Sequence, residues 1–150
     1  STMKADLQAK LLRALEDRLI RRVGGTKEIK IDIRLITATN RNIPQMVEEG
    51  GFREDLYWRL KVVEIWMPPL RERIEDVPAL TGAFIRNIAP DYGKDVTGVR
   101  PRAMKALGSY LWPGNIRELR NTIERAILLC DGSEIDLAHL PEEIRQTDNE

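Results

Sequence analysis

"MPPLRER", residues 67–73, marks the point where the pattern of this sequence changes. Proline fixes its own φ angle and has no amide hydrogen, so the pair Pro68-Pro69 interrupts regular secondary structure. Upstream of the pair the sequence contains both helical and strand-like patterns, whereas downstream every periodic segment is helical. We therefore predict two pieces, an α/β piece over residues 1–67 and an all-helical piece over residues 68–150.

Three amphipathic helices are predicted downstream, over residues 75–87, 101–111 and 115–130. Their apolar residues recur at intervals of three and four, which is typical of a helix with one buried face. The residues expected to face inward are Val77, Leu80, Phe84 and Ile88, then Met104, Leu107 and Leu111, then Ile116, Leu119, Ile123 and Ile127. The third helix begins at "WPGN", where we expect Trp112 to be buried and Asn115 to cap the helix.

Upstream, residues from Leu7 onward predict another amphipathic helix that ends near Gly24-Gly25. Its apolar stripe is expected to comprise Leu7, Leu11, Leu12, Leu15 and Leu19. The segment "RLIRRV" before the glycine pair is alternatively the first strand of a hairpin, because glycine permits the positive φ angles of tight turns. Short helices are expected at "IPQMVEEG" and at "REDLYWRL".

Two strands are predicted in the same upstream piece. The segment "EIKIDIRLITATN", residues 28–40, alternates isoleucine and leucine with charged residues, which is the period of a strand. The second strand is the apolar run "VVEIW", residues 62–66. One or two strands are too few for a complete α/β domain, so we interpret the first as an internal strand of a sheet whose remaining strands are not in this chain.

Composition excludes several classes of protein. Lys plus Arg and Asp plus Glu are both 24, so no global basic field attracts nucleic acid or an anionic membrane. The single cysteine, Cys130, permits no intramolecular disulfide and reads as a small buried hydrophobe in a cytoplasmic protein. No apolar run is long enough to span a bilayer. The only histidine, His139, has no companion ligands, so no metal site is predicted.

Four polar side chains are candidates for a site, and each also has an ordinary explanation. Asn40 ends the predicted strand, where α/β sheets place their ligands, but asparagine also caps turns. Arg53 and Arg59 in "FREDLYWRL" flank an acidic pair with which they can form exposed ion pairs of little energetic worth. Arg117 follows the "WPGN" helix start, which would fix its position; its neighbour Arg120 is assigned to an ordinary pair with Glu124.

Three quoted segments together resemble one protein family. They are "LQAKLLRALEDRLIRRVGGTKEIKIDIRLITATNRNI", "FREDLYWRLKVVEIWMPPLRERIEDVPAL" and "LWPGNIRELRNTIERAILL". In this order they resemble the central AAA+ ATPase domain of bacterial sigma-54-dependent transcription activators, the NtrC-like enhancer-binding proteins, over about residues 5–145. The resemblance implies the C-terminal portion of an αβα nucleotide-binding sandwich followed by an α-helical lid subdomain.

The resemblance also implies roles for the candidate residues. Asn40 matches the first sensor of the γ-phosphate, and Arg117 matches the second sensor, which binds the nucleotide of its own subunit. Arg53 and Arg59 match arginine fingers that reach the nucleotide of a neighbouring subunit, a role that suits the permanently charged, planar guanidinium. The segment "RLIRRVGGTKEIK" matches a hairpin that relays nucleotide state; a contact between its arginines and nucleic acid is the competing interpretation.

For the full-length protein, the resemblance implies ATP and Mg²⁺ as ligands, a homo-oligomeric ring, sigma-54 RNA polymerase as partner, and DNA binding by a separate domain. The sequence contains no "GxxxxGK[ST]" phosphate loop, no apolar strand ending in "DE" and no "GAFTGA" loop. We therefore expect this chain to be a fragment that is inactive by itself. The alternative function is a non-enzymatic helical interaction module or DNA-binding module.

Overall fold

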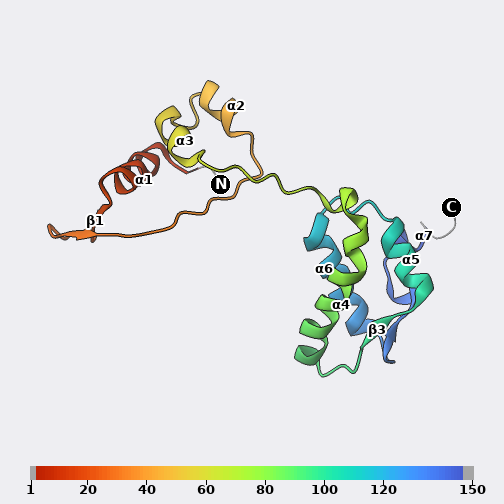
Figure 1. The fold of residues 1–150 in the computed structure, drawn as a ribbon. Coiled ribbons are helices and arrows are strands. Elements are labelled where there is room, and N and C mark those ends of the chain that lie inside the picture. Colours follow the sequence, from red (N-terminus) through yellow and green to blue (C-terminus); the bar gives the residue numbers. More distant parts are fainter. Residues whose placement is uncertain (1–2, 147–150) are drawn as a thin grey trace. The chain divides into compact units, whose positions relative to one another are not determined.

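The computed structural model describes residues 3–146, and the chain divides into two compact units, residues 1–65 and 66–150 (Figure 1). We describe each unit by itself. The N-terminal unit contains, in chain order, α1 (Ala5–Asp17), β1 (Leu19–Arg21), β2 (Glu28–Lys30), α2 (Ile43–Glu48) and α3 (Glu54–Leu60). Both short helices of this unit occur where the sequence predicts them.

Helix α1 is shorter than predicted. It ends at Asp17 because Arg18 takes a left-handed conformation, with φ 53° and ψ 31°, that turns the chain out of the helix. Leu19 therefore lies in β1, and its assignment to the helical stripe is wrong. Leu12 is the one leucine of the predicted stripe that is buried, whereas Leu7 is exposed.

The hairpin interpretation of "RLIRRV" is confirmed. β1 and β2 pair in antiparallel register, with Ile20 opposite Ile29. Gly24 has a φ angle of 75°, which a residue with a side chain rarely adopts, and the amide of Gly25 donates to the carbonyl of Arg22 at 2.9 Å. The glycine pair therefore forms the turn that lets the two short strands meet.

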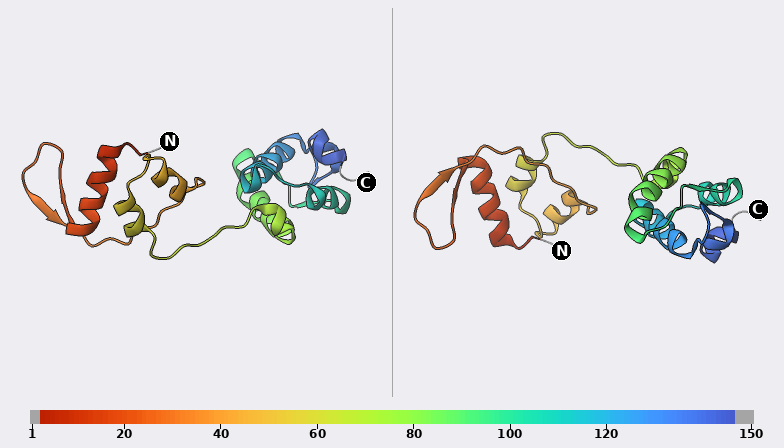
Figure 2. Two further views of the ribbon diagram at one scale, coloured as in Figure 1. Left: turned by 90° about the horizontal axis from the view of Figure 1, so that it is seen from above. Right: turned by 90° about the horizontal axis from the view of Figure 1, so that it is seen from below.

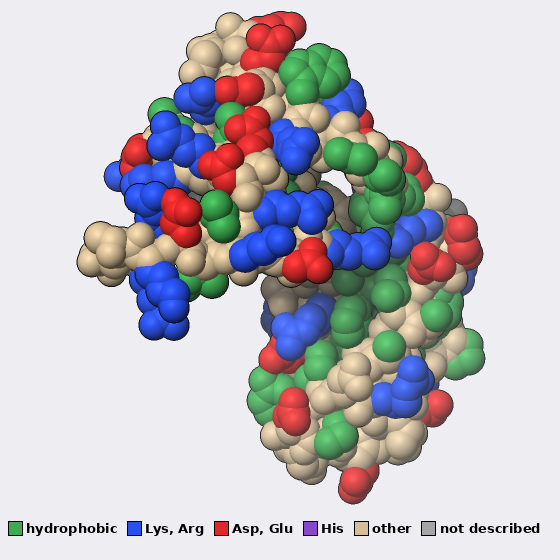
Figure 3. All heavy atoms as spheres, turned by 60° about the vertical axis from the view of Figure 1, so that its left-hand side comes forward, with side chains coloured by type: hydrophobic (Ala, Val, Ile, Leu, Met, Phe, Trp, Pro, Cys, Tyr) green, Lys and Arg blue, Asp and Glu red, His purple; other side chains and the backbone are tan. Residues whose placement is uncertain are grey.

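The predicted strands extend further than the structure supports. Only Glu28–Lys30 of the segment 28–40 is a strand, and residues 62–66 form none. A strand is held by hydrogen bonds to a neighbouring strand, and no described strand pairs with residues 31–40 or 62–66. Their apolar side chains are consequently exposed, among them Ile33, Ile36, Val62, Val63 and Ile65. Figure 3 shows hydrophobic side chains at the surface among charged ones.

The C-terminal unit is a helical bundle, as the sequence predicts. Its elements are η1 (Leu70–Glu72) and η2 (Ile74–Asp76), both 3-10 helices, α4 (Val77–Ile88), η3 (Ala89–Tyr92), β3 (Gly98–Val99), α5 (Pro101–Ser109), α6 (Asn115–Leu129), β4 (Glu134–Ile135), η4 (Leu137–His139) and α7 (Glu142–Gln146). β3 and β4 form a two-residue parallel ladder. Helices α4 and α6 lie side by side in Figures 1 and 2.

The core of this unit lies between its helices. It includes the predicted residues Val77, Ile88, Leu107, Leu119, Ile123 and Ile127, together with Cys130, which is fully buried. Leu80, Phe84, Met104 and Ile116 are partly buried against this core. Leu111 is 70% exposed because α5 already ends at Ser109, so its predicted inward position is wrong.

Trp112 anchors the connection between α5 and α6. Its side chain is fully buried, its indole Nε1 donates to the carbonyl oxygen of Leu107 at 2.9 Å, and its ring meets that of Tyr110 edge to face. The backbone of Trp112 has a φ angle of 54°, an unusual conformation for a large residue. Burial of the indole and its satisfied N–H therefore hold the chain in the turn that begins α6.

Candidate functional site

Arg53 precedes α3 instead of lying on it. The residue is the N-cap, with extended φ and ψ angles of −72° and 133°, so Arg53 and Arg59 do not share one helix as the sequence suggested. The Arg53 guanidinium donates to both carboxylate oxygens of Asp55, at 2.9 Å from Nε and 2.6 Å from Nη2. These hydrogen bonds lower the pKa of the Asp55 carboxyl below its ordinary value. The ordinary ion pair considered for Arg53 is thus present, and its exposure makes it worth little energy.

Arg59 lies in the last turn of α3 and is exposed. Its Nη2 donates to the carbonyl oxygen of Leu15, at the end of α1, over 3.3 Å. Arg59 forms no ion pair with any residue between 3 and 146. One long hydrogen bond to a neutral acceptor leaves most of the donors of the guanidinium available to an anion.

Helix α3 is held in place by α1, through a residue that the sequence analysis missed. Gln8 of α1 is 2% exposed, and its amide contacts the backbone on both sides of Phe52, just before α3. Leu12 of α1 and Leu56 of α3 are buried in the same unit, whose two helices are in contact. The signal was present in the sequence: Gln8 stands one turn before Leu12, on the buried face of an amphipathic helix.

Asn40 is exposed on the chain segment that leads into α2. The ordinary role considered for it, capping the following turn, belongs to other side chains. Asn42 Oδ1 accepts from the amide of Gln45 at 3.2 Å and is the N-cap of α2, while Thr39 Oγ1 accepts from the amide of Arg41 at 3.0 Å. The structure therefore gives Asn40 no capping function in the segment it describes.

The start of α6 is built from polar contacts around Gly114. Glu118 Oε2 accepts from the Gly114 amide at 2.7 Å, and the Tyr110 hydroxyl donates to Glu118 Oε1 at 3.2 Å. Burial raises the pKa of Tyr110, and the Glu118 carboxylate that accepts its hydrogen bond raises this pKa further. A Cβ at Gly114 would lie 2.8 Å from the Cβ of Glu118, so only glycine fits beneath that side chain.

Asn115 does not cap α6, contrary to the sequence prediction. The N-cap is Gly114, and Asn115 has a left-handed φ angle of 53°. Its Oδ1 instead accepts from the amide of Leu70 at 2.8 Å, which ties the first residue of η1 to the start of α6. Asparagine suits this position because it tolerates the left-handed region better than most residues. The helix start is thus fixed from two directions, by Glu118 and by Leu70.

Arg117 projects from this fixed helix start. Its side chain is exposed, and it makes no hydrogen bond or ion pair within the described part of the chain. By contrast, Nη1 of Arg120 lies 3.5 Å from Oε2 of Glu124, so the predicted intrahelical ion pair is confirmed. Arg117 is therefore an available cation at a defined place, which is what an anion site needs.

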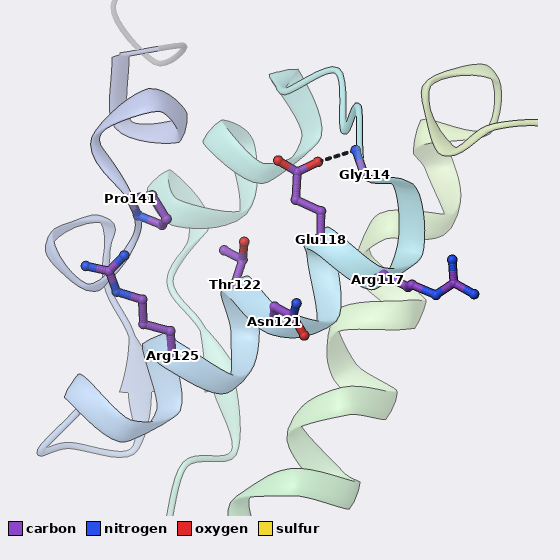
Figure 4. Close-up of a pocket in the computed structure, with 7 residues that line it drawn as sticks. All are labelled: Gly114, Arg117, Glu118, Asn121, Thr122, Arg125 and Pro141. Carbon is purple, nitrogen blue, oxygen red and sulfur yellow. Dashed lines mark hydrogen bonds between the residues drawn. The ribbon is translucent and has the colours of Figure 1, made fainter. Parts of the chain in front are cut away.

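A depression of about 620 Å³ lies along α6 beside Arg117. Its lining residues are Gly114, Arg117, Glu118, Asn121, Thr122, Arg125 and Pro141 (Figure 4). Arg117 and Arg125 extend from the helix in different directions, Arg125 toward Pro141. Arg125 is a second exposed cation of this surface that the sequence analysis did not single out. The two arginines are eight residues apart, a little over two turns of α6.

The described residues supply anion-binding groups and no metal site. No group of three or more His, Cys, Asp or Glu side chains gathers anywhere between residues 3 and 146. His139 is engaged through Nδ1, which accepts from the amide of Asp136 at 2.9 Å. The donor set therefore fits phosphate oxygens and does not fit Mg²⁺. No helix in this range is long and apolar enough to cross a membrane.

Comparison with known proteins gives the family. Residues 71–150 match the AAA+ ATPase lid domain and residues 1–66 match the Sigma-54 interaction domain. The chain belongs to the NtrC-like sigma-54 activators, and the predicted family is confirmed.

Individual relatives agree with this assignment. The chain is 49% identical over 140 residues to the regulatory protein AtoC of Escherichia coli, and 51% identical over 135 residues to the nitrogen fixation protein AnfA of Azotobacter vinelandii. These matches cover 93% and 90% of this chain but only 30% and 25% of the relatives. The chain thus spans a third or less of their length.

Solved structures give the same result. The structure of NtrX from Brucella abortus in complex with ADP matches with a TM-score of 0.82 and 42% identity, over 96% of this chain and 34% of that one. The structure of the same protein in complex with ATP matches with a TM-score of 0.81. The predicted fold class, the C-terminal portion of an AAA+ αβα sandwich with a helical lid, is confirmed.

Proposed function

We propose that this chain is the C-terminal part of the ATPase domain of a sigma-54 activator that hydrolyses ATP. The observation that carries the proposal is that residues 1–66 match the Sigma-54 interaction domain and residues 71–150 match the AAA+ ATPase lid domain. The exposed cations Arg59 and Arg117 support it, because a guanidinium can donate several hydrogen bonds to phosphate oxygens. Residues 1–67 would be the C-terminal part of the α/β subdomain, and residues 68–150 would be the helical lid.

We assign four roles within this proposal. Arg117 contacts the nucleotide of its own subunit, and Asn40 senses the γ-phosphate. Arg59 and Arg53 act on the nucleotide of a neighbouring subunit, where a guanidinium stabilises the negative charge that redistributes over the phosphoryl oxygens. Arg59 is the stronger candidate because its charge is unpaired, whereas Arg53 must exchange Asp55 for phosphate.

The full-length protein would then form a homo-oligomeric ring, because its sites need residues of two subunits. Its partner would be sigma-54 RNA polymerase, which it remodels in the cytoplasm, and a separate domain would bind DNA. ATP would enter with Mg²⁺, which residues other than 3–146 would hold, since the described residues contain no cluster of metal ligands. No observation favours the alternative of a non-enzymatic module.

A direct test compares the 150-residue chain with the full-length protein. We expect the chain alone to bind no ATP in a calorimetric titration and to release no phosphate, because it lacks the glycine-rich loop whose amides and lysine cradle the phosphates. The full-length protein should bind ATP and hydrolyse it. Tight, magnesium-dependent binding of ATP to the 150-residue chain would contradict the proposal.

The proposed role of Arg117 has its own test. In the full-length protein, Arg117→Ala should weaken ATP binding and leave the melting temperature unchanged, because the side chain is exposed and without a partner in the structure. Arg120→Ala on the same helix is the matched control, since Arg120 pairs with Glu124. The measurement is ATP affinity by calorimetry. If Arg117→Ala and Arg120→Ala bind ATP equally well, Arg117 is an ordinary surface residue.

A further inference from the structure

Gln8, which joins α1 to the backbone before α3, is a buried polar side chain whose three hydrogen bonds all go to backbone groups. The residue is 2% exposed and lies near the start of α1. Its amide nitrogen donates to the carbonyl oxygens of Met3 at 2.8 Å and of Gly51 at 3.1 Å, and its amide oxygen accepts from the backbone amide of Arg53 at 2.8 Å. A buried amide with three good hydrogen bonds fixes whatever it touches, because losing a partner leaves buried polar groups unsatisfied.

Two of these bonds fall on the backbone that leads into α3. Gly51 and Arg53 lie 43 and 45 residues from Gln8 in sequence, so the contact is tertiary and not a local turn. Arg53 is also the N-cap of α3, and no side chain caps that helix. The amide of the N-cap residue is thus held by a side chain of α1, which sets where α3 begins.

The other end of α3 is tied to the same helix. Arg59, in the last turn of α3, donates to the carbonyl of Leu15, two turns along α1 from Gln8. Helix α1 therefore contacts α3 beside both candidate arginines, through Gln8 near Arg53 and through Leu15 at Arg59. A seven-residue helix has little rigidity of its own, so its direction depends on these contacts.

We propose that Gln8 is a positioning residue for the arginines of α3, holding Arg53 and, through the start of the helix, Arg59 in the geometry that hydrolysis at the neighbouring subunit needs. The inference rests on the proposed function of these arginines. A displacement of about 1 Å is enough to cost on the order of 10²-fold in rate when a group acts by orientation. Gln8 itself touches no substrate in this account.

The test uses Gln8→Met in the full-length protein, because methionine keeps the length and helix preference of glutamine and removes all three hydrogen bonds. We expect kcat for ATP hydrolysis to fall at least tenfold, while each subunit still binds one ATP with unchanged affinity. Gln8→Glu should fall between wild type and Gln8→Met, because its carboxylate can still accept from the Arg53 amide. Gln45→Met is the matched control, since Gln45 is exposed on α2 and bonds only to Glu49 through its side chain.

Combining variants separates positioning from general damage. If Gln8 acts through α3, Gln8→Met should add little to the loss caused by the combined variant Arg53→Ala/Arg59→Ala, because both arginines that it positions are already gone. A purely structural role would instead lower the number of ATP sites per subunit, and its effect on the rate would multiply with that of Arg53→Ala/Arg59→Ala. A normal kcat in Gln8→Met, or multiplicative losses, overturns the inference while leaving the proposed function standing.

Should Gln8→Met fail to fold, Gln8→Glu takes its place. A lowered kcat with one ATP still bound per subunit supports the inference, and a normal kcat overturns it. A normal kcat in Arg59→Ala alone overturns the proposed function itself.

Discussion

Arg59→Ala in the full-length protein is expected to lower the rate of ATP hydrolysis by a factor on the order of 10³ to 10⁵, the range found for arginine fingers. Binding of ATP to the subunit's own site should be retained. The reason is that the guanidinium stabilises charge in the transition state at the neighbouring subunit's site. Its loss therefore lowers kcat at that site more than it weakens ATP binding at the subunit's own site.

The measurement combines steady-state hydrolysis with ATP affinity by calorimetry. Arg13→Ala provides the matched control, because Arg13 is an exposed arginine of α1 to which no role is assigned. Arg59 makes one 3.3 Å hydrogen bond to Leu15, so Arg59→Ala should leave the melting temperature close to that of the wild type. A loss of ATP binding in proportion to the loss of hydrolysis would place Arg59 in its own subunit's site and contradict the assignment.

Trp112→Ala is expected to cost the C-terminal unit about 3–5 kcal/mol of unfolding free energy, the usual range for truncating a buried aromatic residue. Trp112 is fully buried, and its indole N–H bonds to Leu107. Trp112→Phe should cost less, because it keeps an aromatic ring in the core. Some cost remains, because the variant loses the hydrogen bond to Leu107 and part of the buried volume. Urea unfolding of the 150-residue chain, followed by circular dichroism, measures both. A cost of Trp112→Ala below about 1 kcal/mol would mean that Trp112 does not anchor the turn before α6.

The helical unit was predictable because its signals are local. Apolar residues at helical spacing placed α4, α5 and α6, and the prolines at 68 and 69 placed the change of pattern. The errors in this unit occur at helix ends, where tertiary contacts decide. Leu111 falls outside α5, and Asn115 bonds to Leu70, 45 residues away, instead of capping α6. No local pattern contains such a partner.

The N-terminal unit was less predictable because strands depend on partners. Residues 31–35 alternate apolar and charged side chains as a strand does, but alternation shows only that the segment has two different faces. The hydrogen bonds that hold a strand must come from another strand. Gln8 was missed for a related reason: its place on the buried face of α1 can be read from the sequence, but its partners at Gly51 and Arg53 are 43 and 45 residues away and appear in no local pattern. Arg59 and Arg117 do lie on helices that the sequence predicts, α3 and α6.

Mixed rings test the central claim, that Arg59 acts across a subunit interface, most directly. Full-length Arg59→Ala subunits are combined with full-length subunits that lack the phosphate-loop lysine, each kind being inactive alone. Some interfaces then join an intact nucleotide site of the first kind to an intact Arg59 of the second. Light scattering of the mixture, with one kind carrying a mass tag, checks that mixed rings assemble. We predict that ATP hydrolysis returns in these rings, whereas mixed rings without any hydrolysis would show that Arg59 serves its own subunit and would contradict the account.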